Sequence, residues 1–107
     1  MGIFIVEKYI IKAEKLGEFA TFYKETLIPF MERRKDLTNE IKSHKIFLQS
    51  MLWGGYVEIT EFENLSEFEK YMHKEMQDNE LMTKIYPQFL PLVVPGTHSM
   101  EIWNTFP

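Results

Sequence analysis

The spacing of apolar residues changes along the chain, and this change most constrains the fold. Residues 2–12 are rich in β-branched and aromatic side chains and predict a strand. From about Glu14, apolar residues recur every three or four positions, as in a helix with one buried face. Pro29 lies inside this helix and removes one backbone donor, so we expect a bend one turn earlier. Residues 36–40 are polar and interrupt the pattern.

Two further strands follow, joined by a tight turn. The first is predicted from about Ile41 to Leu52 and the second from Tyr56 to Phe62. Between them, Gly54-Gly55 is typical of a hairpin turn, because glycine tolerates the positive φ values that such turns need. We therefore expect these two strands to pair antiparallel.

Capping residues mark a second helical region. Asn64, with Glu67 three residues later, forms a capping-box pattern, and Asp78 or Asn79 is expected to cap a second, short helix. We expect helical structure to end at the prolines that follow, Pro87, Pro91 and Pro95, before a last strand over residues 97–106. The order is β-α-β-β-α-β. Right-handed crossovers fold this α+β order into one domain, residues 1–107, with a four-stranded antiparallel sheet and both helices on one face.

The predicted strands are apolar on both faces. In the first strand Ile3 and Ile5 point one way, while Phe4 and Val6 point the other. Two helices cover only one face, and the other would expose more apolar area than a soluble monomer usually does. We therefore expect a homodimer that pairs through these sheet faces. The alternative is that the strand limits are shifted and the extra apolar residues lie in the core.

Charge and composition exclude several classes of protein. The formal net charge is −4, which disfavours a nucleic-acid surface. Glu7 and Lys8 interrupt the apolar amino-terminal run before a signal-peptide core forms, and no apolar run approaches the length of a membrane span. Cysteine is absent, so neither disulfides nor cysteine-bound metals are expected. These features predict a cytoplasmic protein with neither nucleic acid nor membrane as partner.

The segments 3–12 and 15–19, together with the strand-to-helix junction at residues 61–68, resemble NIPSNAP-like and antibiotic-biosynthesis-monooxygenase-like proteins. The resemblance implies the dimeric α-β barrel superfamily, in which two ferredoxin-like sheets pair around a shared cavity. Monooxygenase-like members usually carry a histidine on the second helix, where this chain has Tyr71, with His73 two residues on. A haem-ligand histidine is also missing, so we expect no haem, and neither another cofactor nor a metal.

The resemblance places the Ile3, Ile5, Glu7 and Tyr9 face of the first strand towards the cavity. A carboxylate among isoleucines has a raised pKa if it is buried and unpaired, and so suits a catalytic base near neutral pH. The alternative is that Glu7 pairs with a lysine or lies at a solvated rim. By strand parity Glu58 lies with Tyr56, either in the same cavity or facing solvent.

Other candidate residues carry a titrating or an aromatic group. His44 and His98 are candidate catalytic groups at the cavity rim, although a surface or packing role is the simpler interpretation for each. Tyr9, Tyr56 and Glu58 are candidate substrate-binding residues. Trp53 and Trp103 are candidate stacking walls, with ordinary packing as the alternative.

Two functions are consistent with these residues. In the first, a cofactor-independent enzyme of monooxygenase or isomerase type acts on a small hydrophobic molecule. Glu7 or a histidine removes a proton, and Tyr9 or Tyr56 hydrogen-bonds the oxyanion. In the second, the chain is a non-catalytic module that binds a small molecule or simply assembles. A cavity with two polar groups in reach of one ligand atom favours the enzyme, and a cavity filled by side chains favours the module.

Overall fold

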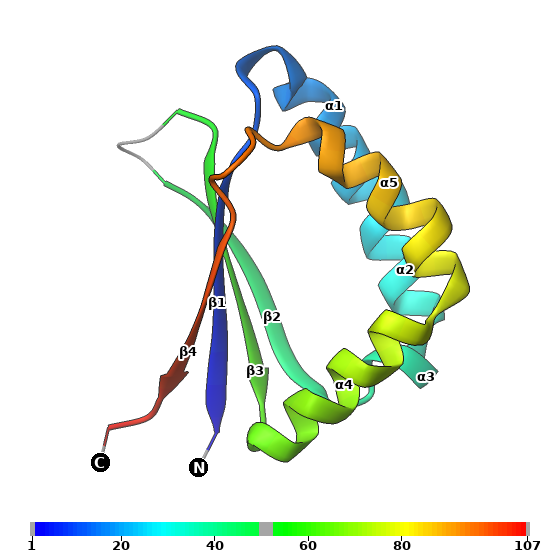
Figure 1. Ribbon diagram of the computed structural model, residues 1–107, viewed down its shortest axis with the longest axis vertical. Coiled ribbons are helices and arrows are strands. Elements are labelled where there is room, and N and C mark those ends of the chain that lie inside the picture. The colour runs from blue at the N-terminus through cyan, green and yellow to red at the C-terminus, as the bar shows by residue number, and fades with distance from the viewer. Residues whose placement is uncertain (1, 50–52, 107) are drawn as a thin grey trace.

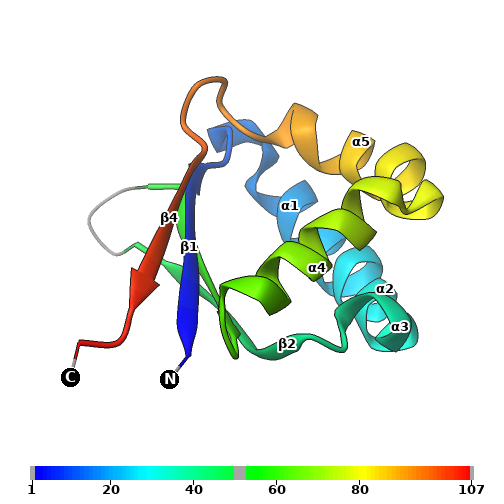
Figure 2. The same ribbon diagram turned by 60° about the horizontal axis from the view of Figure 1, so that its bottom comes forward.

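The computed structural model describes residues 2–49 and 53–106. Four strands form one antiparallel sheet: β1 (Ile3–Ile10), β2 (Ile41–Leu48), β3 (Gly55–Phe62) and β4 (Ser99–Asn104). Their order across the sheet is β2-β3-β1-β4. All the helices lie on one face of this sheet (Figures 1 and 2). The predicted ferredoxin-like α+β fold is confirmed, and the strand centres agree with the prediction, although β1 and β4 are shorter at both ends.

Between β1 and β2 the chain is almost continuously helical. A 3₁₀ turn (Ala13–Lys15) leads into α1 (Leu16–Phe22), a π-helical segment (Tyr23–Leu27), α2 (Ile28–Arg33) and α3 (Lys35–Thr38). The last of these corrects the prediction that residues 36–40 only break the helical pattern. Leu37 is its one buried residue, and this single apolar side chain anchors α3 to the core.

The second helical region begins with α4 (Leu65–Gln77), as the capping pattern predicted. The Asn64 side chain accepts a hydrogen bond from the Glu67 backbone N–H at 3.0 Å. A π-helical segment (Leu81–Ile85), α5 (Tyr86–Phe89) and a 3₁₀ turn (Leu90–Leu92) follow. Asp78 caps this stretch, because its carboxylate accepts from the Leu81 N–H at 2.9 Å.

Both helical layers contain a proline directly after a π-helical segment. Pro29 lies in the first turn of α2 and Pro87 in the first turn of α5. The irregularity one turn before Pro29 is confirmed. The prediction that Pro87 ends the helix was wrong, because the wider π turn before it removes the clash between the proline ring and the preceding helical carbonyl. Both helical regions therefore continue past their prolines.

The turn before β3 requires glycine at position 54. Gly54 has a φ of +78°, and a Cβ there would lie 2.7 Å from the carbonyl oxygen of Ile11. The same close approach lets the Ile11 N–H donate to the Gly54 carbonyl at 2.8 Å. The predicted end of the second strand, at Leu52, lies outside the described residues.

The apolar core between the sheet and the helices is divided into two clusters. One contains Tyr9 of β1 and Ile11 just after it, with the buried faces of both helical regions, and the other contains Ile3 and Ile5 with Phe62 and Phe68. Glu7 is the inward-facing residue of β1 between them. The carboxylate that interrupts the strand therefore lies where the core itself is interrupted.

Within residues 2–49 and 53–106, no helix or strand covers the opposite face of the sheet (Figure 2). Phe4, Phe47 and Trp103 point to that side, and Phe47 and Trp103 are 49% and 46% exposed. This observation agrees with the two-sided apolar strands that the sequence predicted. Among the described residues, each helix is too short or too polar to cross a membrane.

Candidate functional site

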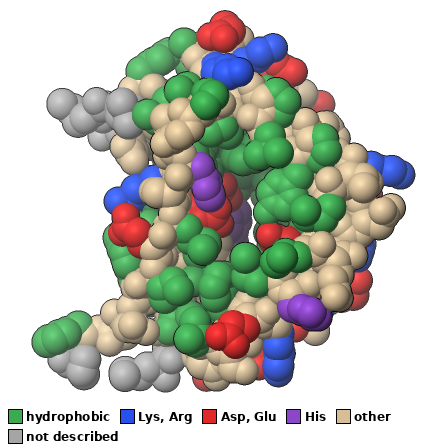
Figure 3. Space-filling model, viewed as in Figure 1, with side chains coloured by type: hydrophobic (Ala, Val, Ile, Leu, Met, Phe, Trp, Pro, Cys, Tyr) green, Lys and Arg blue, Asp and Glu red, His purple; other side chains and the backbone are tan. Residues whose placement is uncertain are grey.

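A cavity of about 130 Å³ lies between the sheet and the helices. Figure 3 shows it as a hollow with histidine and acidic side chains inside and hydrophobic side chains around it. Its volume is below the roughly 300–1,000 Å³ of pockets that hold drug-sized ligands, so it suits a small molecule. The expected cavity was one shared between two sheets, whereas this one is enclosed by one chain. The physical reason is that the helices cover the face that carries Ile5 and Glu7.

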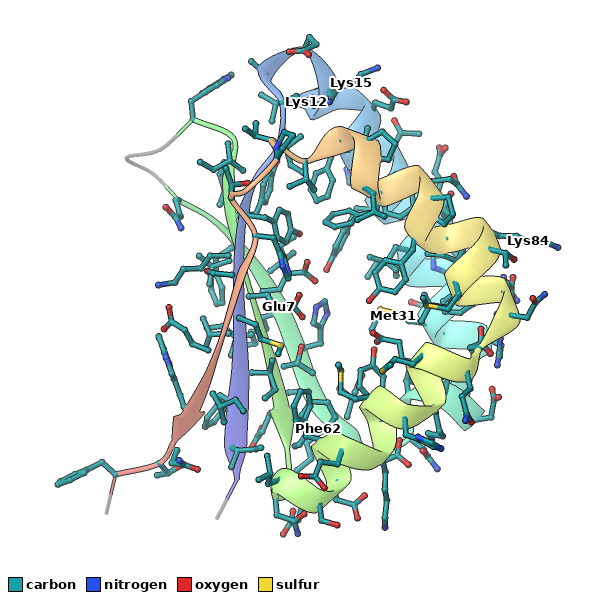
Figure 4. All side chains as sticks on the ribbon, in the orientation of Figure 1. Glu7, Lys12, Lys15, Met31, Phe62 and Lys84 are labelled. Atoms are coloured by element: carbon teal, nitrogen blue, oxygen red, sulfur yellow. The ribbon has the colours of Figure 1, made fainter. Side chains whose placement is uncertain are left out.

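Two carboxylates lie side by side on the sheet wall of the cavity. Glu7 on β1 and Glu58 on β3 are directly opposite each other in the antiparallel register. Residues opposite each other on neighbouring strands share a face of the sheet, and both side chains line the cavity. Figure 4 shows Glu7 pointing from the sheet towards the helical wall, where Met31 lies.

Glu58 forms the more buried of two carboxylate–histidine pairs. Its Oε1 lies 2.8 Å from Nε2 of His44, and its Oε2 accepts a hydrogen bond from the Tyr9 hydroxyl at 2.5 Å. The side chains of His44 and Glu58 are each only 16% exposed. Because an ionised carboxylate only accepts hydrogen bonds, these contacts make His44 Nε2 the donor and hold both oxygens of Glu58 in place.

Glu7 forms the second pair, with His98. Oε2 of Glu7 lies 2.9 Å from Nε2 of His98, and the two side chains are 37% and 49% exposed. Burial of the carboxylate is the main cause that raises the pKa of Glu7. The hydrogen bond from His98 opposes this shift, and the charge of Glu58 adds to it. The pKa of Glu7 is therefore raised even though the side chain is paired, and its partner is a histidine rather than the lysine of the alternative.

Tyr9 connects the two pairs. Its hydroxyl donates to Glu58, and its ring stacks on that of His98 with centroids 6.3 Å apart. Burial and the nearby charge of Glu58 raise the pKa of Tyr9 far above its usual value. Tyr9 therefore remains protonated and acts as a fixed donor to Glu58.

The helical wall contributes a third carboxylate, Glu75 of α4, which sequence reasoning missed. It accepts a hydrogen bond from the Tyr86 hydroxyl at 2.7 Å, and its charge adds to the burial that raises the pKa of Tyr71. The sequence does contain a signal for this residue, because Glu75 follows Phe68, Tyr71 and Met72 at the spacing that places all four on one face of a helix. A stripe chosen by side-chain polarity alone adds Leu65 and Met76 to these three residues, but the two side chains are 48% and 67% exposed.

The structure brings some of the predicted site residues together and separates others. Glu7, Glu58 and His44 line the cavity, while Tyr9 and His98 bind them from its edge. Tyr56 stacks on Tyr9, with ring centroids 6.1 Å apart, in the core beside the cavity. The two tryptophans lie elsewhere: Trp53 is 78% exposed near the β2–β3 turn, and Trp103 is on the opposite face of the sheet.

The cavity residues are not arranged as a metal site. Within residues 2–49 and 53–106, no group of three or more His, Cys, Asp or Glu side chains is placed to hold a metal ion. The remaining histidine, His73, is an exposed residue of α4 and does not line the cavity. The polar groups of the cavity are therefore arranged as hydrogen-bonded pairs, which suits proton transfer.

Solved structures share this fold. A NIPSNAP family protein from Agrobacterium tumefaciens aligns with 99% of this chain and 94% of its own, with a TM-score of 0.78 and 13% identity. An uncharacterised NIPSNAP-like domain protein from Burkholderia xenovorans aligns with 98% of this chain and 85% of its own, with a TM-score of 0.77 and 13% identity. A protein described as an antibiotic biosynthesis monooxygenase aligns with 98% of this chain and 99% of its own, with a TM-score of 0.70 and 13% identity.

These similarities define the class of the fold. The chain has the ferredoxin-like α+β fold of NIPSNAP and antibiotic biosynthesis monooxygenase proteins, as the resemblance in the sequence predicted. No protein-family model matches the chain, and neither does any curated protein sequence. At such low identity, the function must be argued from the cavity itself.

Proposed function

We propose that this protein is a cofactor-independent enzyme that removes a proton from a carbon atom of a small hydrophobic molecule. The observation that carries the proposal is the pair of hydrogen-bonded Glu–His contacts, Glu7–His98 and Glu58–His44, in one largely apolar cavity. Apolar pockets with a few convergent polar groups are typical of small-molecule sites. An open cavity also favours this function over a module whose interior is filled by side chains.

Glu7 is the proposed base. Its raised pKa increases its affinity for a proton, and its position between the two core clusters directs it at a bound ligand. In the proposed step the C–H bond beside a carbonyl breaks and the proton moves to the Glu7 carboxylate. The electron pair moves onto the carbonyl oxygen, giving an enolate. His98, half exposed at the rim, connects the same carboxylate to solvent.

The enolate oxygen needs a hydrogen-bond donor inside the cavity. The sequence suggested Tyr9 or Tyr56, but the Tyr9 hydroxyl donates to Glu58 and Tyr56 packs beside the cavity. Thr60 lines the cavity on the same face of β3 as Glu58, so its hydroxyl is the better donor. Glu58 then has a positioning role, because it holds the ring of His44 beside the ligand.

Return of the proton to a different carbon completes an isomerisation. Glu7 as base, Thr60 as hydrogen-bond donor and His98 as the link to solvent are sufficient for this reaction. In the monooxygenase branch the enolate instead reacts with molecular oxygen; the substrate carbon supplies all four electrons, so one oxygen atom enters the substrate and the other leaves as water. The printed description of one neighbour, antibiotic biosynthesis monooxygenase, supports keeping that branch open. Both branches share the first proton transfer, so this step is the one to test.

The test is solvent exchange followed by NMR. With 2-tetralone as the probe in deuterium oxide, the wild-type protein should speed the loss of the proton NMR signals of the hydrogens on the carbons beside the carbonyl, as deuterium replaces them. Glu7→Gln should reduce this rate about a hundredfold or more, the usual range for loss of a general base. Glu69→Gln, at an exposed position of α4, is the matched control and should keep the wild-type rate. Exchange no faster than in buffer, or full activity of Glu7→Gln, contradicts the proposal.

We also propose that two copies pair through the uncovered sheet face. Phe47 and Trp103 are large apolar side chains at opposite edges of this face, and each is about half exposed in the single chain. A second copy presents the same apolar surface, which two-fold symmetry makes self-complementary. Light scattering should give twice the chain mass of 12.8 kDa, and Trp103→Glu should shift it towards the monomer. A monomeric wild-type protein at micromolar concentration contradicts the pairing.

A further inference from the structure

Acidic side chains enter the cavity from both layers of the fold. Glu7 and Glu58 come from the sheet, and Glu75 comes from α4 on the helical side. The charge of Glu75 acts on Glu7 and on the tyrosines of the helical wall, so the carboxylates share one electrostatic environment. The described lining contains neither lysine nor arginine. Lys12, Lys15 and Lys84 lie outside the cavity (Figure 4).

The three carboxylates differ in how their charge is balanced. Glu7 and Glu58 each have a histidine within 2.9 Å, which offers a protonatable partner. Glu75 accepts a hydrogen bond from the Tyr86 hydroxyl, and in the described part of the chain it forms no ion pair. A hydroxyl donor leaves the charge of this carboxylate uncompensated. A carboxylate in an apolar cavity without a cation is costly, and a cationic ligand removes that cost.

Aromatic side chains line the cavity that this carboxylate enters. Tyr71 and Tyr86 line the cavity, and Phe62 packs on Tyr71 with ring centroids 5.5 Å apart. Ring faces attract cations within about 6 Å of their centroid. The same walls exclude water from the apolar part of a ligand. The cavity thus combines an uncompensated carboxylate with aromatic surface, and it lacks the ligand grouping of a metal site within residues 2–49 and 53–106.

We infer that the ligand of this cavity is a small organic cation, an ammonium group on an apolar or aromatic body. This inference rests on the proposed function, because it names the substrate class of the same site. The ammonium group pairs with Glu75 on the helical wall, and the apolar body lies across the cavity towards Glu7 and Glu58. The opposite choice, an anionic ligand, is disfavoured because three carboxylates face it and the cavity offers it neither lysine nor arginine.

The test compares three probes that share a phenyl ring and carry a cationic, a neutral or an anionic substituent: benzylamine, benzyl alcohol and benzoate. Each is titrated into ¹⁵N-labelled protein at neutral pH, and its affinity is measured from NMR shifts of cavity residues. Benzylamine should bind about tenfold more tightly than benzyl alcohol, which corresponds to about 1.4 kcal/mol. Benzoate should bind more weakly than either. Glu75→Gln, which keeps an acceptor for Tyr86, should remove the preference for benzylamine.

The matched control is Glu69→Gln, an exposed glutamate on the same helix. This variant makes the same change in net charge away from the cavity and should keep the tenfold preference. Equal affinity for benzylamine and benzyl alcohol in the wild-type protein overturns the cationic class but leaves the cavity a small-molecule site. Equal loss in both variants overturns it as well, because the effect is then one of overall charge. Absence of binding by all three probes overturns the inference, and the exchange assay with 2-tetralone then judges the proposed function separately.

Discussion

The two Glu–His pairs of the cavity have the same composition but opposite surroundings. Glu58 and His44 are each 16% exposed, and a third group, the Tyr9 hydroxyl, fixes the carboxylate. Glu7 and His98 are 37% and 49% exposed, and Glu7 has only its histidine. The buried pair is therefore built for fixed geometry and the rim pair for exchange of protons. Identical side chains acquire different roles because one pair has a full set of partners and the other does not.

Loss of the buried carboxylate should have the largest effect on stability. Glu58→Gln removes the charge that receives hydrogen bonds from Tyr9 and His44, and each such bond contributes about 1.5–3 kcal/mol. The expected decrease in the free energy of unfolding is about 2 kcal/mol, measured by urea denaturation with the slope unchanged. A decrease of less than about 0.5 kcal/mol, the range of ordinary surface substitutions, would mean that the buried pair is not a structural unit.

The rim carboxylate should respond in the opposite direction. The pKa of Glu7 in the folded state is raised above its ordinary value of 4.5. The stability that its bound proton contributes is therefore fully present below pH 4.5, and it is lost as the pH rises through the higher pKa of the folded state. Glu7→Gln removes this loss. The variant should therefore gain stability relative to wild type as the pH rises to neutrality, in urea titrations at several pH values. A difference that does not change with pH would show that Glu7 is an ordinary solvated carboxylate.

The smallest effect is expected at the rim histidine. His98→Gln breaks an exposed contact, and such contacts contribute about 0–1 kcal/mol. The free energy of unfolding should stay within about 0.5 kcal/mol of wild type in the same urea assay. His44→Gln is the matched change in the buried pair and should cost clearly more. Equal costs for the two histidine variants would remove the distinction between the pairs.

The sheet side of the cavity could be predicted from the sequence, but the helical side could not. A strand has a period of two residues, so parity grouped Glu7 with Ile3 and Ile5 and grouped Glu58 with Tyr56, while the family resemblance turned the Glu7 face towards the cavity. On α4 an apolar stripe chosen by side-chain polarity excludes the half-buried Glu75 while admitting the exposed Met76. His98 follows the loop after Pro95, where neither periodicity applies. Its contact with Glu7 joins residues 91 positions apart and comes only from the fold.

The division of the core into two clusters separates the residues that stabilise the protein from those that face a ligand. Ile3 and Phe62 anchor one end of the sheet, and Ile11 and Phe30 belong to the cluster at the other, so neither cluster depends on the identity of residue 7. A substitution at position 7, between the clusters, is free to change what the cavity binds while both ends stay packed. A scaffold with this property can diversify its chemistry through a handful of positions, whereas a continuous core couples each such change to folding.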